Sequence, residues 1–167
     1  MSVRSVVPVT EYLETVYRPD REYIDGELLE RNVGEWDHSR FQALLSHYLL
    51  DRERQWGILA VLAQRVQVNA ARFRVPDIVV LTGPPPTSGI VREPPFLCIE
   101  ILSPRDRMQE MQERVDDYLA FGVPHVWVIQ PHPLRAFVYT RDGMHEAKDG
   151  VLTTAQPALR VVLSELQ

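Results

Sequence analysis

Two apolar runs, each about the length of a buried strand, most constrain how this chain can fold. The first reads RVPDIVVL over residues 74–81, and the second reads FLCIEILSP over residues 96–104. Both are rich in residues that favour strands. Each also carries one carboxylate, Asp77 or Glu100. A bare charge inside a buried strand is costly, so each acid needs a proton, a cation or a metal ion. Two such acids on successive runs predict a functional site.

The composition fits one globular domain spanning residues 1–167. Its 167 residues and 45% hydrophobic content are enough for a proper core. No apolar run approaches the roughly 20 residues that cross a bilayer, and the first residues do not resemble a secretory signal, so we expect a cytoplasmic protein. The one cysteine, Cys98, lies inside the second run and is expected to be buried packing. A net charge of -5 argues against a constitutive nucleic-acid coat but leaves room for a local basic groove.

The first half of the chain predicts two helices and several strands. A short helix is expected over residues 10–17 and a long one from about residue 37, with Gly57 as its stop. Between them, Asp25-Gly26 is a two-residue turn that should join residues 22–24 to residues 27–31 in a hairpin. Residues 58–69 read as a strand pair or a bent strand.

The second half predicts a loop, a helix and further strands. Residues 82–95 contain five prolines and two glycines and should form a surface loop. The Ser103-Pro104 pair is a helix-start signature, and this helix should run to residue 121. Residues 125–131 read as a strand, residues 135–147 as a hairpin, and residues 161–167 as a closing segment.

The two strand acids suggest metal chemistry. Asp77 and Glu100 are separated by a loop, so adjacent strands could bring both carboxylates to one edge of a sheet. Hard oxygen ligands of this kind suit Mg²⁺, which can orient a water molecule and stabilise charge on a phosphodiester. Glu27 and His38 are auxiliary candidates, although Glu27 also fits the solvent face of a strand and His38 an ordinary position near a helix start. Arg114 borders the buried face of its predicted helix.

A family resemblance adds to this interpretation. Pro76-Asp77 followed by Glu100 in an apolar strand resembles the PD-(D/E)XK nuclease superfamily. The ordered series EYIDGELLE, an Asp-His pair opening a long helix, RVPDIVVL, CIEILSP, YLAFGVP and HVWVIQP is similar to the Uma-two family of restriction-endonuclease-like proteins, from about residue 22 to residue 139. The resemblance implies an α/β restriction-endonuclease-like core, with a mixed central sheet flanked by helices. It also implies DNA phosphodiester hydrolysis and a divalent metal, Mg²⁺ or Mn²⁺, held by Asp77, Glu100 and the main-chain carbonyl of Ile101.

The chain departs from the family pattern at its lysine. The superfamily places a lysine two residues after the glutamate, where this chain has Leu102, and the Uma-two pattern places it on the following helix, at the position of Arg114. Lys148 is the one lysine and lies outside the motif. Arginine can hold a phosphate but stays protonated and cannot act as a base. Gln130 also replaces the usual aspartate at the end of its strand.

Three interpretations remain open from the sequence. The leading one is a metal-dependent endonuclease that acts on DNA, with Arg114 stabilising the scissile phosphate. It is expected to form a homodimer, since nucleases of this type often act on two strands. The second is a catalytically degenerate nuclease fold that serves as a DNA- or protein-binding module. The third is an α/β domain in which Asp77 and Glu100 merely pair with arginines.

Overall fold

A six-stranded mixed sheet forms the centre of the molecule. The computed structural model describes residues 6–31 and 34–166. Strands β7 and β8 are parallel, and the other neighbouring strands of this sheet are antiparallel. Their spatial order is β10 (Gly143–Glu146), β9 (Arg135–Thr140), β8 (His125–Gln130), β7 (Leu97–Ile101), β6 (Ile78–Leu81) and β3 (Leu59–Leu62).

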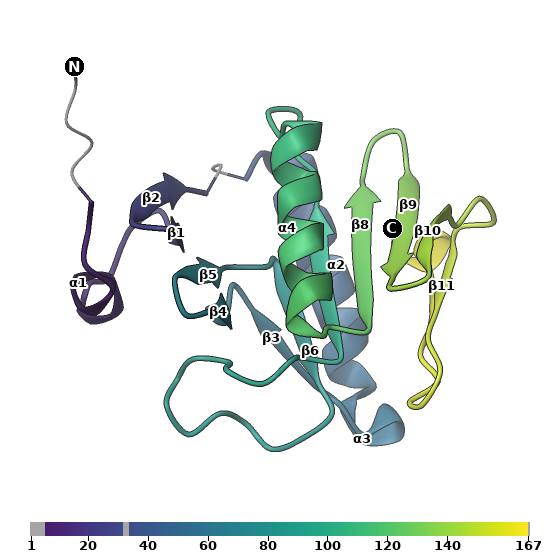
Figure 1. Cartoon of the computed structure of the whole chain (residues 1–167). Helices are drawn as coiled ribbons and strands as arrows, with labels where there is room; N and C mark the ends of the chain where they lie inside the picture. The colour runs from purple at the N-terminus through teal and green to yellow at the C-terminus, as the bar shows by residue number, and fades with distance from the viewer. Residues whose placement is uncertain (1–5, 32–33, 167) are drawn as a thin grey trace.

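Two helices cover the two faces of this sheet. Helix α4 (Met108–Phe121) lies in front of the sheet and α2 (Trp36–Asp51) behind it in Figure 1. The α2 side is packed by buried side chains such as Leu45, Ile99 and Trp127. The α4 side is packed by Val115 and Cys98 among others. Burying each large apolar side chain contributes roughly 1.5–3 kcal/mol, so both helices are held to the sheet by these cores.

A smaller antiparallel sheet lies beside the N-terminal helix α1 (Val9–Glu14). Its buried aromatic core consists of Tyr12, Tyr23 and Phe73, and the Tyr12 hydroxyl donates a 2.9 Å hydrogen bond to the carbonyl of Arg21. The strands of this sheet, in spatial order, are β2 (Glu27–Glu30), β1 (Arg21–Ile24), β5 (Arg72–Arg74) and β4 (Val66–Asn69).

Short elements complete the chain. The single long helix predicted up to Gly57 is divided, because Arg52, with φ of -108° and ψ of 5°, leaves the helical conformation after α2. Helix α3 (Glu53–Trp56) follows, and the left-handed residue Gly57, with φ of 64°, ends it. Strands β11 (Val151–Thr153) and β12 (Arg160–Val162) pair near the C-terminus, and a 3₁₀ turn, η1 (Leu163–Glu165), follows them.

The local turn signals of the sequence are confirmed. Asp25 and Gly26 both have positive φ, 51° and 97°, as a two-residue hairpin turn requires. Residues 82–95 form the expected loop, and Cys98 is buried and unpaired. Residue 167 of the predicted closing segment lies outside the described residues.

Two predicted helix boundaries were wrong. The N-terminal helix begins at Val9 and stops at Glu14, because Thr15 has an extended backbone. Helix α4 begins at Met108 instead of near Ser103. The Ser103 amide donates to the Asp106 carboxylate at 2.7 Å, and the Asp106 amide donates to the Ser103 carbonyl. These bonds close a turn over residues 103–106, but Arg107 has an extended backbone, with φ of -91° and ψ of 133°, so the helix begins only at Met108.

Residues 58–69 are divided between two sheets and do not pair with each other. Strand β3 pairs with β6 in the central sheet, whereas β4 pairs with β5 in the small one. Ala63, with φ of 45°, lies between them and redirects the chain. Among the described residues, no helix is both long and apolar enough to cross a membrane.

Candidate active site

The register of β6 against β7 brings the two strand acids together. Ile78 pairs with Ile99 and Val79 with Cys98, so continuing the antiparallel register by one residue sets Asp77 opposite Glu100. Side chains alternate between the two faces of a strand. Val79 and Cys98 belong to the core on the α4 side, so both acids lie on that side too.

One guanidinium nitrogen bridges the two carboxylates. Nη2 of Arg31 lies 2.9 Å from Oδ1 of Asp77 and 3.2 Å from Oε2 of Glu100. The other oxygen of each acid has a separate donor. The amide of Ile101 donates to Oδ2 of Asp77 at 2.7 Å, and the Tyr118 hydroxyl donates to Oε1 of Glu100 at 2.6 Å. Each acid therefore directs one oxygen at the same cation.

Burial and charge move the pKa values of the two acids apart. Glu100 is fully buried, and that burial, together with the negative charge of Asp77, raises its pKa to about 7 against the opposing effect of Arg31. Burial would also raise the pKa of Asp77, but the hydrogen bond from His38 and the charge of Arg31 hold it below its usual range. Asp77 is therefore the permanently charged member of the pair at neutral pH.

His38 lies at the start of α2 and reaches Asp77. Its Nε2 is 3.3 Å from Oδ1 of Asp77, the oxygen that also binds Arg31. This hydrogen bond raises the pKa of His38 above its usual value. The side chain of Gln42, one turn further along α2, donates to the main-chain carbonyl of Asp77 at 3.0 Å. Helix α2 thus supports the acid from one side.

A third buried acid, Glu22 on β1, extends the site. It accepts hydrogen bonds from Nη1 of Arg74 at 2.9 Å, from Nε of Arg114 at 3.2 Å and from the Val75 amide at 3.0 Å. Nη1 of Arg31 lies 3.9 Å from Glu22. Glu22 and Arg31 therefore link the small sheet to the acid pair on the central sheet.

The remaining residues singled out from the sequence lie around this cluster. Arg114 is buried on α4 and binds Glu22. Glu22 in turn lies 3.9 Å from Arg31, the arginine that bridges Asp77 and Glu100. Glu27 stands opposite Ile24 in the β1–β2 hairpin, on the face that also carries Glu22. Leu102, where the superfamily has its lysine, packs against the core on the α4 side, and Lys148 is exposed after β10.

An open cleft leads to the site. It has a volume of about 560 Å³, and its lining includes Asp77, Arg31 and His38 together with Tyr17 and Arg18. Asp77 is 6% exposed, whereas Glu100 is fully buried. A small ion or water molecule can approach the pair from the Asp77 side.

Among the described residues, side chains alone do not supply a complete set of metal ligands. Across residues 6–31 and 34–166, no three His, Cys, Asp or Glu side chains are arranged so that they could hold a metal ion. The donors that the sequence suggests are two carboxylates and one main-chain carbonyl, that of Ile101, the last residue of β7. Such a set would leave several positions for water, as Mg²⁺ usually requires.

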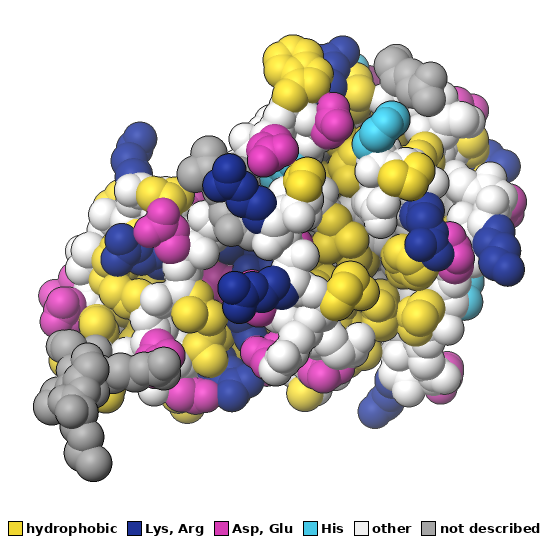
Figure 2. All heavy atoms as spheres, turned by 90° about the horizontal axis from the view of Figure 1, so that it is seen from above, with side chains coloured by type: hydrophobic (Ala, Val, Ile, Leu, Met, Phe, Trp, Pro, Cys, Tyr) yellow, Lys and Arg dark blue, Asp and Glu magenta, His cyan; other side chains and the backbone are white. Residues whose placement is uncertain are grey.

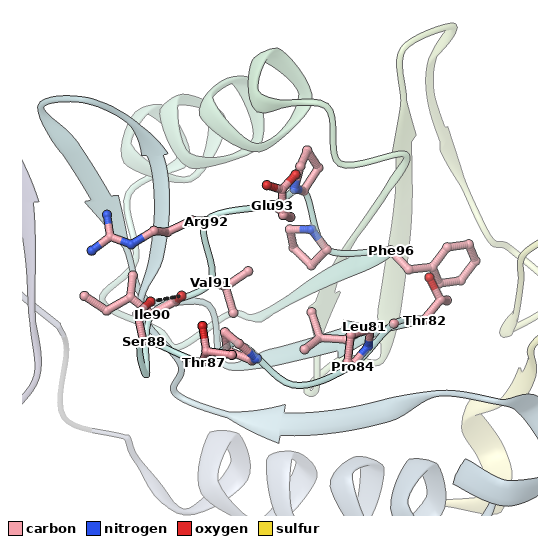
Figure 3. Close-up of a pocket in the computed structure, with 14 residues that line it drawn as sticks. Leu81, Thr82, Pro84, Thr87, Ser88, Ile90, Val91, Arg92, Glu93 and Phe96 are labelled. Atoms are coloured by element: carbon pink, nitrogen blue, oxygen red, sulfur yellow. Dashed lines mark hydrogen bonds between the residues drawn. The ribbon is translucent and has the colours of Figure 1, made fainter.

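A second cavity lies within the proline-rich loop. Its volume is about 470 Å³. Figure 3 shows the side chains that line it, including Val91, Phe96 and Leu81. The hydrogen bond from the Ser88 hydroxyl to the Ile90 carbonyl crosses one side of it. It shares no lining residue with the cleft at Asp77, and its lining holds no buried charge pair.

Sequence reasoning missed Glu22, Arg31 and Tyr118 as parts of the site. Glu22 and Arg31 lie on a hairpin whose acids read as solvent-facing, and nothing local marks one of them for burial. Tyr118 stands four residues after Arg114 on a predicted helical stripe. That spacing was the available signal, because it puts both side chains on one face of α4.

The fold and the acid pair define a restriction-endonuclease-like α/β protein: a mixed sheet between two helices, with Glu100 on β7 and Asp77 immediately before the adjacent antiparallel strand β6. Within that class, the chain belongs to the Uma2 family, whose model, described as "Putative restriction endonuclease", matches residues 10–166. This finding confirms the family resemblance drawn from the sequence motifs.

A solved structure shares the fold. The crystal structure of a protein from Anabaena variabilis ATCC 29413, described as a "putative nuclease belonging to DUF820", superposes with a TM-score of 0.83 at 23% sequence identity. The match covers 96% of this chain and 97% of that one. No curated protein matches the chain.

Proposed function

We propose that this protein is a divalent-metal-dependent endonuclease that hydrolyses phosphodiester bonds in DNA. Its family and fold support a nuclease. The observation that carries the proposal is the convergence of Asp77 and Glu100, from adjacent strands, on one cation position now held by Nη2 of Arg31. Two carboxylate oxygens that meet at one point fit Mg²⁺, which usually takes one or two protein carboxylates. The pairing of both acids with Arg31 also matches the third interpretation drawn from the sequence, an α/β domain in which they pair with arginines, so the test below must separate the two.

The donor set fits Mg²⁺ or Mn²⁺ in kind. Oδ1 of Asp77 and Oε2 of Glu100 are hard oxygen ligands, and the Ile101 carbonyl is the third proposed donor. The second oxygens of the acids are held by the Ile101 amide and the Tyr118 hydroxyl, which fix both carboxylates in orientation. When bound, the ion would lower the pKa of a water molecule and stabilise charge on the phosphodiester.

The neighbouring residues would orient and charge the site. His38 holds Oδ1 of Asp77 and lines the cleft. We propose that Arg114 stabilises the scissile phosphate through its positive charge and not by direct contact, because it is buried, binds Glu22 and is not part of the cleft lining. As a guanidinium it cannot accept a proton from water, so its part is electrostatic. Glu27 remains an auxiliary candidate through its position on the same hairpin face as Glu22.

DNA would contact the protein at the cleft and not across a broad basic surface. On the end of the molecule seen in Figure 2, basic and acidic side chains are interspersed over the described residues, and no broad basic surface stands out. This agrees with the net charge of -5. Arg18 and Arg31 are the arginines that line the cleft. A homodimer would supply two such clefts for cutting both strands.

The test is cleavage of supercoiled plasmid and single-stranded DNA with Mg²⁺ or Mn²⁺. Asp77→Asn and Glu100→Gln keep the shape of each side chain but remove its charge, and each should lower the rate by about a hundredfold or more. Glu30→Gln and Asp142→Asn, at exposed positions, are the matched controls and should cleave as the unmodified protein does. Equal rates in all five proteins would end the proposal.

The second candidate is a binding module that has lost catalysis. Two observations favour it: Arg31 fills the space between the acids, and the expected lysine is Arg114. Such a module would bind DNA or a protein partner without cutting. Fluorescence anisotropy with labelled DNA in EDTA separates the two functions, because a module would bind equally well with and without metal and leave the DNA intact.

A further inference from the structure

Three acidic side chains surround the guanidinium of Arg31. Its guanidinium lies within 4 Å of Asp77, Glu100 and Glu22, and its side chain is 15% exposed. These three acids raise the pKa of Arg31 far above its usual value against the effect of burial. The arginine is therefore a permanent internal cation for the acid pair.

The position of this guanidinium coincides with that of the proposed metal ion. Oδ1 of Asp77 and Oε2 of Glu100 are the oxygens that meet at Nη2. The other oxygen of each acid is bound by the Ile101 amide or the Tyr118 hydroxyl, and Oδ1 of Asp77 also lies 3.3 Å from Nε2 of His38. A divalent ion at the same place would contact a second positive charge in a poorly solvated site, where like charges repel strongly. Ion and guanidinium exclude each other.

The Arg31 side chain can leave its position between the two acids. Arg31 lines the open cleft together with Asp77 and His38. Its backbone amide is fixed by a 2.9 Å hydrogen bond to the carbonyl of Asp20, the residue before β1. The guanidinium can therefore turn into the cleft by side-chain rotation, without unpairing the hairpin.

We propose that Arg31 is an intramolecular competitor of the divalent metal: it bridges Asp77 and Glu100 when no ion is bound and must leave the bridge before an ion binds. This role rests on the proposed metal site. It keeps the two acids paired in the absence of metal, because two adjacent buried carboxylates without a counter-ion would repel each other. It also sets the metal affinity, since binding includes the loss of two ion pairs.

Calorimetric titration with Mn²⁺ tests this directly, on the full chain at pH 8 and without DNA. Arg31→Gln should bind Mn²⁺ about tenfold more tightly or better than the unmodified protein, and Arg31→Lys should fall between them, because one ammonium bridges two acids less well. Arg72→Gln is the matched control. It removes the same charge from an arginine that contacts Asp25 and Asp117 but none of the three acids at Arg31, and should change the affinity by less than about threefold.

Thermal melts report Mn²⁺ binding even if Arg31→Gln is less stable, because the Tm of each protein is compared with and without the ion. Without metal, Arg31→Gln should melt at a lower temperature than the unmodified protein, and saturating Mn²⁺ should raise its Tm by the larger amount. Equal or weaker Mn²⁺ binding by Arg31→Gln, with equal Tm increments, would overturn the competition while leaving the metal site in place. Absence of Mn²⁺ binding in every variant would instead overturn the metal-dependent function itself.

Discussion

The Nε of Arg114 lies 3.2 Å from Oε2 of Glu22, so the arginine at the expected lysine position binds a third buried acid. The same oxygen accepts a hydrogen bond from Arg74, and the other oxygen accepts one from the Val75 amide, two residues before Asp77. Glu22 thus ties α4 and the small sheet to the segment that carries the catalytic candidate Asp77.

Replacing Glu22 should therefore destabilise the fold. Glu22→Gln removes a charge that is fully buried among arginines, and breaking a buried ion pair by removing one partner costs roughly 3–5 kcal/mol. The measurement is urea unfolding. Glu30→Gln on the same hairpin removes an exposed acid that pairs with Arg21, and should change stability little. Similar midpoints for the two variants would contradict the prediction.

Arg114→Lys tests whether the arginine has taken over the role of the lysine. The ammonium is shorter and lacks the Nε donor that binds Glu22, so a charge-assisted hydrogen bond is lost. We expect DNA cleavage to fall about tenfold. Plasmid cleavage with Mn²⁺ measures this, with Glu30→Gln as a control. A gain in cleavage would instead identify a degenerate site and favour the binding module.

The pairing of His38 with Asp77 predicts a pH-dependent contribution to stability. The pKa of His38 is raised above 6.5, so its contribution is complete below pH 6.5 and is lost as the pH rises through the folded value. The pKa of Asp77 is lowered below 3.8, so its contribution is complete above pH 3.8 and is lost on acidification. The pair is therefore strongest between these two values.

The measurement is the Tm of the unmodified protein and of His38→Gln across pH 4 to 9. Their difference should be largest between about pH 4 and 6.5 and should shrink toward pH 9. His47→Gln, on the same helix, is the control and should give a difference without this profile. A His38→Gln difference that grows with pH would refute the pairing.

Metal binding should weaken on acidification because of Glu100. Burial raises the pKa of this acid to about 7, so below that pH it carries a proton that must leave before it can bind an ion. The Mn²⁺ affinity should fall about tenfold for each pH unit below 7 and level off above it. Calorimetry at several pH values measures both the affinity and the proton release. A flat affinity between pH 5 and 8 would mean that Glu100 is not a ligand.

Several features could be derived from local sequence because local chemistry decides them. Asp25-Gly26 supplies the positive φ of a hairpin turn wherever it stands, and Gly57 ends a helix for the same reason. The pairing of Asp77 with Glu100 was also within reach, because two strands joined by one loop are commonly neighbours. The start of α4 was not, because the extended backbone of Arg107 separates the Ser103–Asp106 turn from the helix, and no local signal marks that residue.

By itself, the sequence determined the acids of the central sheet, the turns that place them and the family to which the chain belongs. Tertiary structure alone decided that Glu22 is buried, that Arg114 binds it and that Arg31 bridges Asp77 and Glu100. The reason is physical: the position of a long charged side chain depends on which opposite charges the packing of two sheets and a helix brings within its reach. Those partners are 46 and 69 residues away from Arg31 along the chain, so no local pattern encodes them.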